Sequence, residues 1–216
     1  MIERVTIQAG DLALEGLLER PDDGSVWGSV AVCHPHPLYG GNMQNNVVTR
    51  VTPALAQAGL AALRFNFRGV GRSQGTFAEG IGEQDDLRAA LAFLAAAGGM
   101  ADKPLFAVGY SFGAAVVARA ACGDPRIAAL ACIALPAGFP GYDDFPELGR
   151  CGRPKLFLHG AADSLCPVSK IREIVGALLG PPSLIVLPQT DHFFRAREDE
   201  LTSHLVQFLT GLRPRP

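Results

Sequence analysis

One serine stands in a setting that is typical of a nucleophile. Ser111 lies in the stretch GYSFG, after the apolar run PLFAVGY and before an alanine-rich run of helical composition. Where a strand turns sharply into a helix, the backbone of the serine is strained and side chains two residues away on either side would collide, so glycine is expected at 109 and 113. The hydroxyl then stands clear of the sheet and can attack an electrophile. The alternative is a glycine-rich turn between strand and helix in which the serine only caps the helix; it would have the same five-residue sequence.

A serine hydroxyl needs a general base within hydrogen-bond reach, and this base needs a carboxylate to orient it. His159, His192 and His204 follow Ser111 in the chain. We interpret His204 as a surface or packing residue of an amphipathic helix, and His159 as a structural residue at the end of a strand. His192 lies in LPQTDHFF, in a loop between the last expected strand and the last expected helix. This position predicts the base.

Several carboxylates could orient His192. Asp163 follows a strand in LFLHGAADSLCP and precedes His192 in the chain, as the order serine, acid, histidine requires. Asp191 is a competitor, but adjacent side chains diverge, so a neighbour in sequence rarely reaches the imidazole Nδ1. Asp143 and Asp144 follow the preceding strand, and we interpret them as a solvated loop face. Asp163 is therefore the predicted acid.

The stretch VCHPHPLYGGNM (32–43) has two readings. His34 and His36, two residues apart, could both face one metal ion in extended geometry, but no further ligands follow at a recognised spacing. We therefore expect no metal. The alternative is that the loop presents its backbone to the substrate, with the two histidine side chains hydrogen-bonded within the loop.

Acyl transfer requires two backbone N–H groups that bind the developing oxyanion. The amide of Phe112, at the start of the helix after Ser111, is the first predicted donor. The prolines of the 32–43 loop have no N–H. The amide of His36 is therefore the predicted second donor, with Leu38 or Tyr39 as the alternatives.

A third loop, RFNFRGVGRSQG (64–75), contains a G-x-G spacing. The remainder of the phosphate-binding pattern is absent and no helix follows at once, so the stretch is a weak signal for a nucleotide. We interpret Asn66 and Arg68 as part of a hydrogen-bonded turn that braces the nucleophile.

These loops follow short apolar runs that alternate with helical patterns. The opening residues alternate as in a hairpin with its turn at Gly10-Asp11. A helix near 47–58 would carry Pro53 in its interior, whereas Thr52 as N-cap with Pro53 at the first helical position would start a helix cleanly. Buried strands separated by helices indicate a mostly parallel sheet covered on both faces, with reactive groups at the carboxyl ends of the strands. The expected strands are 29–34, 60–67, 104–110, 127–135, 155–160 and 183–188, and the expected helices are 82–98, 111–122, 168–179 and 198–209.

Composition limits the classes of protein that remain. The 216 residues suit one domain, and 48% hydrophobic residues are enough for a sizeable core. A formal charge of −2 without a basic block argues against nucleic acid, and no run reaches the ~18 uncharged apolar residues of a membrane helix. The first residues do not read as a secretory signal. Five scattered cysteines without C-x-x-C spacing predict reduced thiols and a cytoplasmic protein.

The motifs HPHPLYGG, NFRGVGRSQG, GYSFG, HGAADSLCP and DHFF together resemble, in type and order, those of the α/β-hydrolase superfamily, over nearly the whole chain. Within it, the chain looks like the small bacterial esterase-like hydrolases that share the H-P-H-P loop. It is also similar to the dienelactone hydrolases, although Ser111 stands where these usually carry cysteine. The resemblance implies a single α/β-hydrolase domain over residues 1–216, with a mostly parallel sheet, an N-terminal antiparallel hairpin and helices on both faces. It also implies a serine triad that hydrolyses ester-type bonds.

The segment 136–153 is short where larger relatives carry a helical lid, so we expect an open site without a lid domain. The residues predicted to line the substrate pocket come from this segment and from the neighbouring loops: Leu38, Tyr39, Gly40, Tyr110, Phe139 and Tyr142.

We therefore expect a carboxylesterase-like serine hydrolase with no cofactor and a small-molecule ester-type substrate, and neither nucleic acid nor a membrane as partner. The same residues would serve a thioester, a lactone or a short peptide. A binding protein that has lost catalysis would keep the same fold. A homodimer is left open.

Overall fold

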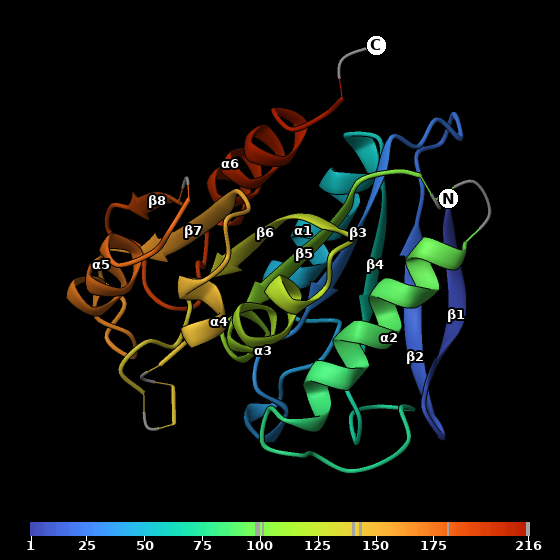
Figure 1. Cartoon of the computed structure of the whole chain (residues 1–216), viewed down its shortest axis with the longest axis horizontal. Helices are drawn as coiled ribbons and strands as arrows, with labels where there is room; N and C mark the ends of the chain where they lie inside the picture. Colours follow the sequence, from blue (N-terminus) through green and yellow to red (C-terminus); the bar gives the residue numbers. More distant parts are fainter. Residues whose placement is uncertain (98–99, 101, 140, 143, 181, 215–216) are drawn as a thin grey trace.

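The fold is built around one eight-stranded sheet (Figure 1). The computed structural model describes residues 1–97, 100, 102–139, 141–142, 144–180 and 182–214. Across the sheet the strands lie in the order β1-β2-β4-β3-β5-β6-β7-β8. Their bounds are Ile2–Ala9 (β1), Leu12–Glu19 (β2), Gly28–Cys33 (β3), Leu60–Phe65 (β4), Leu105–Tyr110 (β5), Ile127–Ile133 (β6), Lys155–Gly160 (β7) and Pro182–Leu187 (β8).

The sheet is parallel except at one edge. Strands β3 to β8 run parallel to one another, whereas β1 and β2 form an antiparallel hairpin and β2 is also antiparallel to β4. The hairpin turns at Gly10, whose φ of +60° suits glycine. Every residue of β3, β4 and β5 is buried, as expected for strands covered on both sides.

Helices cover both faces of the sheet (Figure 1). Apolar side chains of α1 and α6 share one core cluster with one face, and those of α2, α3, α4 and α5 share a second cluster with the other. The predicted α/β architecture is confirmed. The helices are Asn46–Gln57 (α1), Gly82–Ala96 (α2), Phe112–Ala120 (α3), Pro146–Gly149 (α4), Val168–Gly176 (α5) and Glu198–Thr210 (α6).

Of the two starts predicted for the first helix, the one at Thr52 is wrong, and the helix near 47–58 is the one that forms. Helix α1 begins at Asn46, with Asn45 as its N-cap accepting from the N–H of Val47, and Pro53 lies in its interior. A proline inside a helix costs about 3 kcal/mol because a hydrogen bond is lost and its ring crowds the preceding turn. Burial of the apolar face of α1 against the sheet offsets this cost.

Between β6 and β7 the chain forms little regular structure. Among its described residues this segment contains one short helix, α4, and nothing that could cover the carboxyl ends of the strands as a lid domain would. The expectation of a lidless fold is confirmed.

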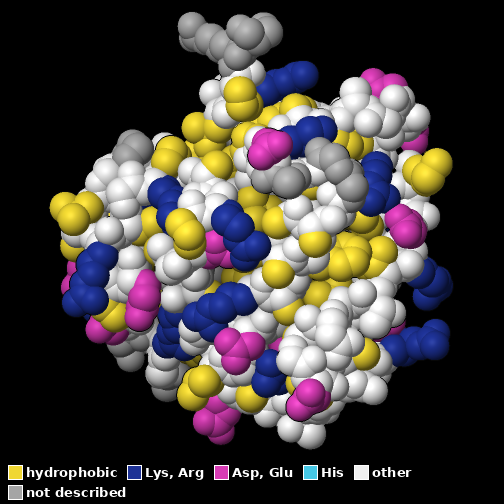
Figure 2. All heavy atoms as spheres, turned by 45° about the vertical axis from the view of Figure 1, so that its right-hand side comes forward, with side chains coloured by type: hydrophobic (Ala, Val, Ile, Leu, Met, Phe, Trp, Pro, Cys, Tyr) yellow, Lys and Arg dark blue, Asp and Glu magenta, His cyan; other side chains and the backbone are white. Residues whose placement is uncertain are grey.

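The outer surface is mixed in character. Figure 2 shows the face that carries the hairpin edge, where acidic and basic side chains are interspersed with apolar ones. In the part of the chain that the structure describes, every helix is too short or too polar to cross a membrane.

The expectation that all five cysteines are reduced is wrong. Cys122, just after α3, and Cys151, just after α4, form a disulfide, and their Cα atoms lie 5.6 Å apart, inside the usual range. Cys33, Cys132 and Cys166 are free and buried, as expected. The pair has no motif spacing, and only the packing of α4 beside α3 brings it together.

Candidate active site

Ser111 lies at the turn from β5 into α3, in strained backbone geometry. Its φ of +54° and ψ of −116° are rarely adopted by residues other than glycine. A Cβ atom on Gly109 would lie 2.1 Å from the carbonyl oxygen of Gly113, and one on Gly113 would lie 2.5 Å from that of Cys33. The prediction that close packing requires glycine at both positions is confirmed.

Three predicted residues form a continuous hydrogen-bonded chain. The hydroxyl of Ser111 donates to Nε2 of His192 over 3.0 Å, and the Nδ1–H of His192 donates to Oδ2 of Asp163 over 2.7 Å. His192 and Asp163 are 6% and 5% exposed, so little water competes for these bonds. The arrangement can move a proton from the hydroxyl to the imidazole and stabilise the resulting imidazolium.

Asp163 is held as an ionised carboxylate. Its Oδ1 accepts from the N–H groups of Leu165 and Cys166. Burial alone would raise the pKa of Asp163, but the hydrogen bonds from His192 and Cys166 outweigh it, so the pKa lies below its ordinary value. The carboxylate is therefore negative at neutral pH and can orient the imidazole.

The competing carboxylates lie elsewhere. Asp191 accepts from the N–H of Phe193 in its own turn. Asp144 is exposed, and Asp143 lies outside the described residues. His159 has a structural position, as expected, because its Nε2–H donates to the carbonyl of Cys166 at 2.6 Å.

Tyr110 has a different place from the one predicted. We expected its side chain in the substrate pocket, but it is 3% exposed and its hydroxyl donates to the carbonyl of His192 at 2.9 Å. Burial and the nearby Asp163 raise the pKa of Tyr110 well above its ordinary value, so the phenol remains protonated. Tyr110 therefore holds the loop of the histidine, a role that no sequence signal distinguished from lining the pocket.

The loop after β3 leaves one candidate amide free. The N–H of Leu38 donates to Nδ1 of His36, and that of Tyr39 donates to the carbonyl of His36. The N–H of His36 has no acceptor within the described residues. Phe112 is the first residue of α3, so its N–H has no partner inside the helix. Of the three amides considered in this loop, His36 alone remains free to bind an oxyanion.

The buried side chain of His34 holds this loop in place through hydrogen bonds. It is fully buried, its Nδ1–H donates to the carbonyl of Pro35 at 2.6 Å, and its Nε2 accepts from the N–H of Phe67 at 3.1 Å. Burial lowers the pKa of His34 to about 4, so the ring is neutral at physiological pH. Both ring nitrogens are engaged, and neither is available to a metal while these bonds stand.

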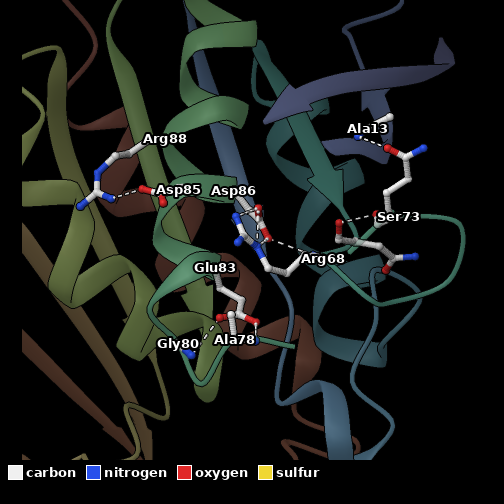
Figure 3. A network of polar contacts seen from close by, with 11 residues as sticks. Ala13, Arg68, Ser73, Ala78, Gly80, Glu83, Asp85, Asp86 and Arg88 are labelled. Carbon is white, nitrogen blue, oxygen red and sulfur yellow. Dashed lines mark hydrogen bonds and ion pairs between the residues drawn. The ribbon is translucent and has the colours of Figure 1, made fainter. Parts of the chain in front are cut away.

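Polar side chains also anchor the loops around 66–81, and Asn66 and Arg68 form hydrogen bonds there, as expected. Asn66 accepts from the N–H of Met43, and Arg68 forms a multiply hydrogen-bonded pair with the buried Asp86. Glu83, fully buried on α2, was not predicted; its carboxylate accepts from the N–H groups of Ala78 and Gly80 (Figure 3). Glu83 thereby fixes the loop that carries Phe77, whose ring packs against those of His36 and Phe112.

A cavity of about 80 Å³ lies over the serine. Three of the predicted pocket residues, Tyr39, Phe139 and Tyr142, line it. Leu38 and Gly40 do not. Leu38 points into solvent, at 69% exposure, and Gly40, with φ of +81°, serves the turn. The full lining comprises His36, Tyr39, Ser111, Phe112, Pro136, Phe139, Tyr142, Leu165, Cys166 and His192.

Among the residues that the structure describes, one group of side chains has ligand atoms close enough to hold a metal. Asp163, Cys166 and His192 each place one within 4.8 Å of the others. Burial and Asp163 raise the pKa of the Cys166 thiol to about 12, so it is protonated at neutral pH, and the other two groups are bonded to each other. This chemistry suits the proton relay better than a metal ion.

Comparisons with known proteins agree with this geometry. Residues 27–145 match the family described as Serine aminopeptidase, S33. An α/β serine hydrolase homologue from Coxiella burnetii is 35% identical, with a TM-score of 0.86 over 95% of this chain and 96% of its own. An α/β serine hydrolase without a lid from Xanthomonas campestris is 32% identical, with a TM-score of 0.88 over 100% of this chain and 96% of its own. An uncharacterised protein from Rickettsia prowazekii is 36% identical over 84% of this chain and 78% of its own length.

The family match spans more than half of the chain, and two of these relatives align over nearly the whole of both structures. Both carry the same fold, and the second lacks a lid as this chain does. The chain therefore belongs to the Serine aminopeptidase, S33 family of the α/β-hydrolase superfamily, in its branch of lidless bacterial serine hydrolases.

Proposed function

We propose that the chain hydrolyses small ester-type substrates through an acyl-enzyme intermediate, with Ser111 as nucleophile. The observation that supports this most directly is the hydrogen-bonded chain from Ser111 through His192 to Asp163, beside a cavity that the first two residues line. This arrangement meets the geometric requirement for an activated serine.

Acylation begins when Ser111 Oγ attacks the carbonyl carbon and His192 Nε2 takes the hydroxyl proton. Asp163 keeps the imidazole in the tautomer with a proton on Nδ1 and stabilises the imidazolium. The amides of Phe112 and His36 bind the oxyanion. The tetrahedral intermediate then collapses, the C–O bond to the alcohol breaks, and His192 returns the proton to the leaving oxygen.

Deacylation repeats these steps with water. His192 takes a proton from a water molecule that attacks the acyl-serine, the same two amides bind the second oxyanion, and the serine oxygen leaves with the proton from His192. The products are a carboxylic acid and an alcohol, and no cofactor takes part.

The lining of the cavity favours an uncharged ester over a peptide. None of the described residues that line it is Asp, Glu, Lys or Arg. An aminopeptidase substrate carries an ammonium group next to the scissile bond, which needs a carboxylate partner once it is desolvated. A lactone that carries a carboxylate would likewise lack a cation. A neutral ester, thioester or lactone carries no charge that would need an oppositely charged partner in the cavity.

Labelling and turnover test this proposal together. Wild-type protein should react with a fluorophosphonate probe and hydrolyse p-nitrophenyl acetate, and Ser111→Ala should lose both. Ser203→Ala, at an exposed position on α6, is the matched control and should retain both. Well-folded wild-type protein without labelling would favour a binding protein that has lost catalysis. A panel of esters, thioesters, neutral lactones and aminoacyl amides then ranks the bond types.

Two expectations about context remain predictions. A disulfide is unusual in the cytoplasm of most organisms, so the redox state of Cys122 and Cys151 in cells tests the cytoplasmic location that the sequence indicates. Light scattering at several protein concentrations tests the homodimer.

A further inference from the structure

Large apolar side chains gather at the mouth of the cavity. The described residues expose nine large apolar side chains, and four of these stand around the serine: Tyr39, Phe139, Leu165 and Phe193, with exposed fractions of 77%, 36%, 47% and 46%. Three line the cavity, and the ring of Phe193 lies 5.7 Å from that of His192. We call these four residues the apolar collar. Single exposed apolar residues need no explanation, but a gathered set marks a binding surface.

The cavity inside the collar is small. A volume of about 80 Å³ has room for about five to eight water-sized positions. An ester has an acyl half and an alcohol half, and a space of this size accommodates one short half. The other half must extend over the collar.

The direction of proton transfer indicates which half lies where. His192 must return a proton to the leaving oxygen, so the alcohol half departs past the imidazole. Phe193 adjoins that imidazole in sequence and in space, and Leu165 belongs to the turn whose N–H groups hold Asp163. The alcohol half therefore meets the collar. The acyl half faces the aromatic rings of Phe112 and Tyr142, which pack edge to face against each other.

We propose that the preferred substrates are esters of a short, uncharged acyl group with a larger apolar alcohol, such as an aryl alcohol. This inference rests on the proposed function and assigns the two halves of the substrate to two parts of one site. Each methylene of the alcohol that the collar covers should raise kcat/KM by up to about fourfold. Each acyl carbon beyond the capacity of the cavity should lower it.

Two series of esters test the assignment with the wild-type protein. In the first, the acyl group is acetyl and the alcohol grows from ethanol through hexanol to 2-phenylethanol, alcohols of similar acidity, so that leaving-group ability stays nearly constant; kcat/KM should rise. In the second, p-nitrophenyl esters run from acetate to decanoate; kcat/KM should fall at least about tenfold by octanoate, because extra methylenes forced into a filled cavity are strained against its walls. A rise along the acyl series with no dependence on the alcohol would overturn the inference while leaving the proposed function intact.

Substitutions in the collar test whether these residues cause the preference for a larger alcohol. Tyr39→Ser and Phe193→Ser should each lower the ratio of kcat/KM for naphthyl acetate to that for ethyl acetate. Leu179→Ser is the matched control, because Leu179 is 64% exposed and lies outside the cavity lining; it should leave the ratio unchanged. Equal ratios in all four proteins would overturn the role of the collar. Loss of Ser111-dependent turnover altogether would instead overturn the proposed function, and this inference with it.

Discussion

Two substitutions of His34 should separate the folding role of this buried ring from its effect on the proposed oxyanion hole. Its Nδ1–H holds the carbonyl of Pro35, and no cis peptide bond occurs in the described chain. In a planar trans peptide the C=O and the next N–H point in opposite directions. By fixing the carbonyl of Pro35, the ring of His34 therefore also fixes the direction of the His36 N–H.

Asn and Gln each reproduce one half of the imidazole. His34→Asn places an amide N–H₂ close to the position of Nδ1, so the bond to Pro35 is kept and the bond from Phe67 is lost. His34→Gln places an amide oxygen close to the position of Nε2, so the Phe67 bond is kept and the Pro35 bond is lost. Each variant gives up one buried hydrogen bond, worth about 1 kcal/mol, and both should lose similar stability in urea.

Activity should differ between the two variants. One oxyanion donor is worth about 10²–10³ in kcat, and a misdirected donor loses part of that, so His34→Gln should lower kcat about 10- to 100-fold with KM little changed. His34→Asn should remain close to wild type. The inhibition constant of a trifluoromethyl ketone, which mimics the oxyanion, should rise in His34→Gln by the same factor as kcat falls.

A second perturbation reaches the same carbonyl without touching His34. A Cβ on Gly41 would lie 2.1 Å from the oxygen of Pro35, whereas one on Gly40 meets no atom within 4 Å. Gly41→Ala should therefore reproduce the kinetic signature of His34→Gln, and Gly40→Ala should add only the strain of a positive φ. The reasoning would be refuted by equal kinetic losses in His34→Asn and His34→Gln, or by a His34→Gln enzyme with full kcat.

Four further predictions follow from the same contacts. Tyr110→Phe removes the bond that holds the histidine loop, worth about 1 kcal/mol, and should lower kcat about fivefold in steady-state assays. Glu83→Gln leaves one of two amides, the half-buried one of Ala78 or the buried one of Gly80, without an acceptor and should cost about 1–3 kcal/mol in urea unfolding. His34 takes up a proton near its ordinary pKa when the chain is unfolded, but only near pH 4 when it is folded. The free energy of unfolding should therefore fall as the pH drops from about 6.5 to 4, by roughly 3 kcal/mol at most. This pH dependence should be shallower in His34→Asn. Reduction of Cys122–Cys151 should lower stability by about 3.6 kcal/mol, and dithiothreitol should have no effect on the doubly serine-substituted chain.

The sequence indicated the elements and the meeting of Ser111 with His192 because both follow from short-range rules. Apolar runs bounded by glycine mark buried strands, and loops that follow parallel strands must meet at one edge of the sheet. These two rules bring together residues 81 positions apart in the chain. The position of Asp163 near His192 follows by the same argument. Asp191, the competing carboxylate, does not orient His192, because it accepts a hydrogen bond within its own turn.

Features that depend on tertiary packing could not be predicted from the sequence by these rules. Pro53 argues for a helix start, but the buried face of α1 outweighs the local preference. Cys122 and Cys151 have no motif spacing, and their pairing depends on how two helix ends pack. Tyr110 adjoins Ser111 in the chain, yet it turns beneath the histidine loop, and periodicity does not show the direction of a side chain at a strained turn.

Glu83 and Tyr110, whose roles sequence reasoning missed, share one physical task with His34, whose hydrogen bond within its own loop was expected. Glu83, Tyr110 and His34 each bond a backbone group of a loop at the carboxyl edge of the sheet. Loop backbone lacks the regular hydrogen bonds of helices and strands, so its buried polar groups need other partners, and side chains supply them here. Asp163 does both tasks, because Oδ1 anchors its own turn while Oδ2 orients His192. The rigidity that the proposed acyl transfer demands of this site therefore comes from polar residues of strands, loops and a helix whose contacts no sequence pattern reveals.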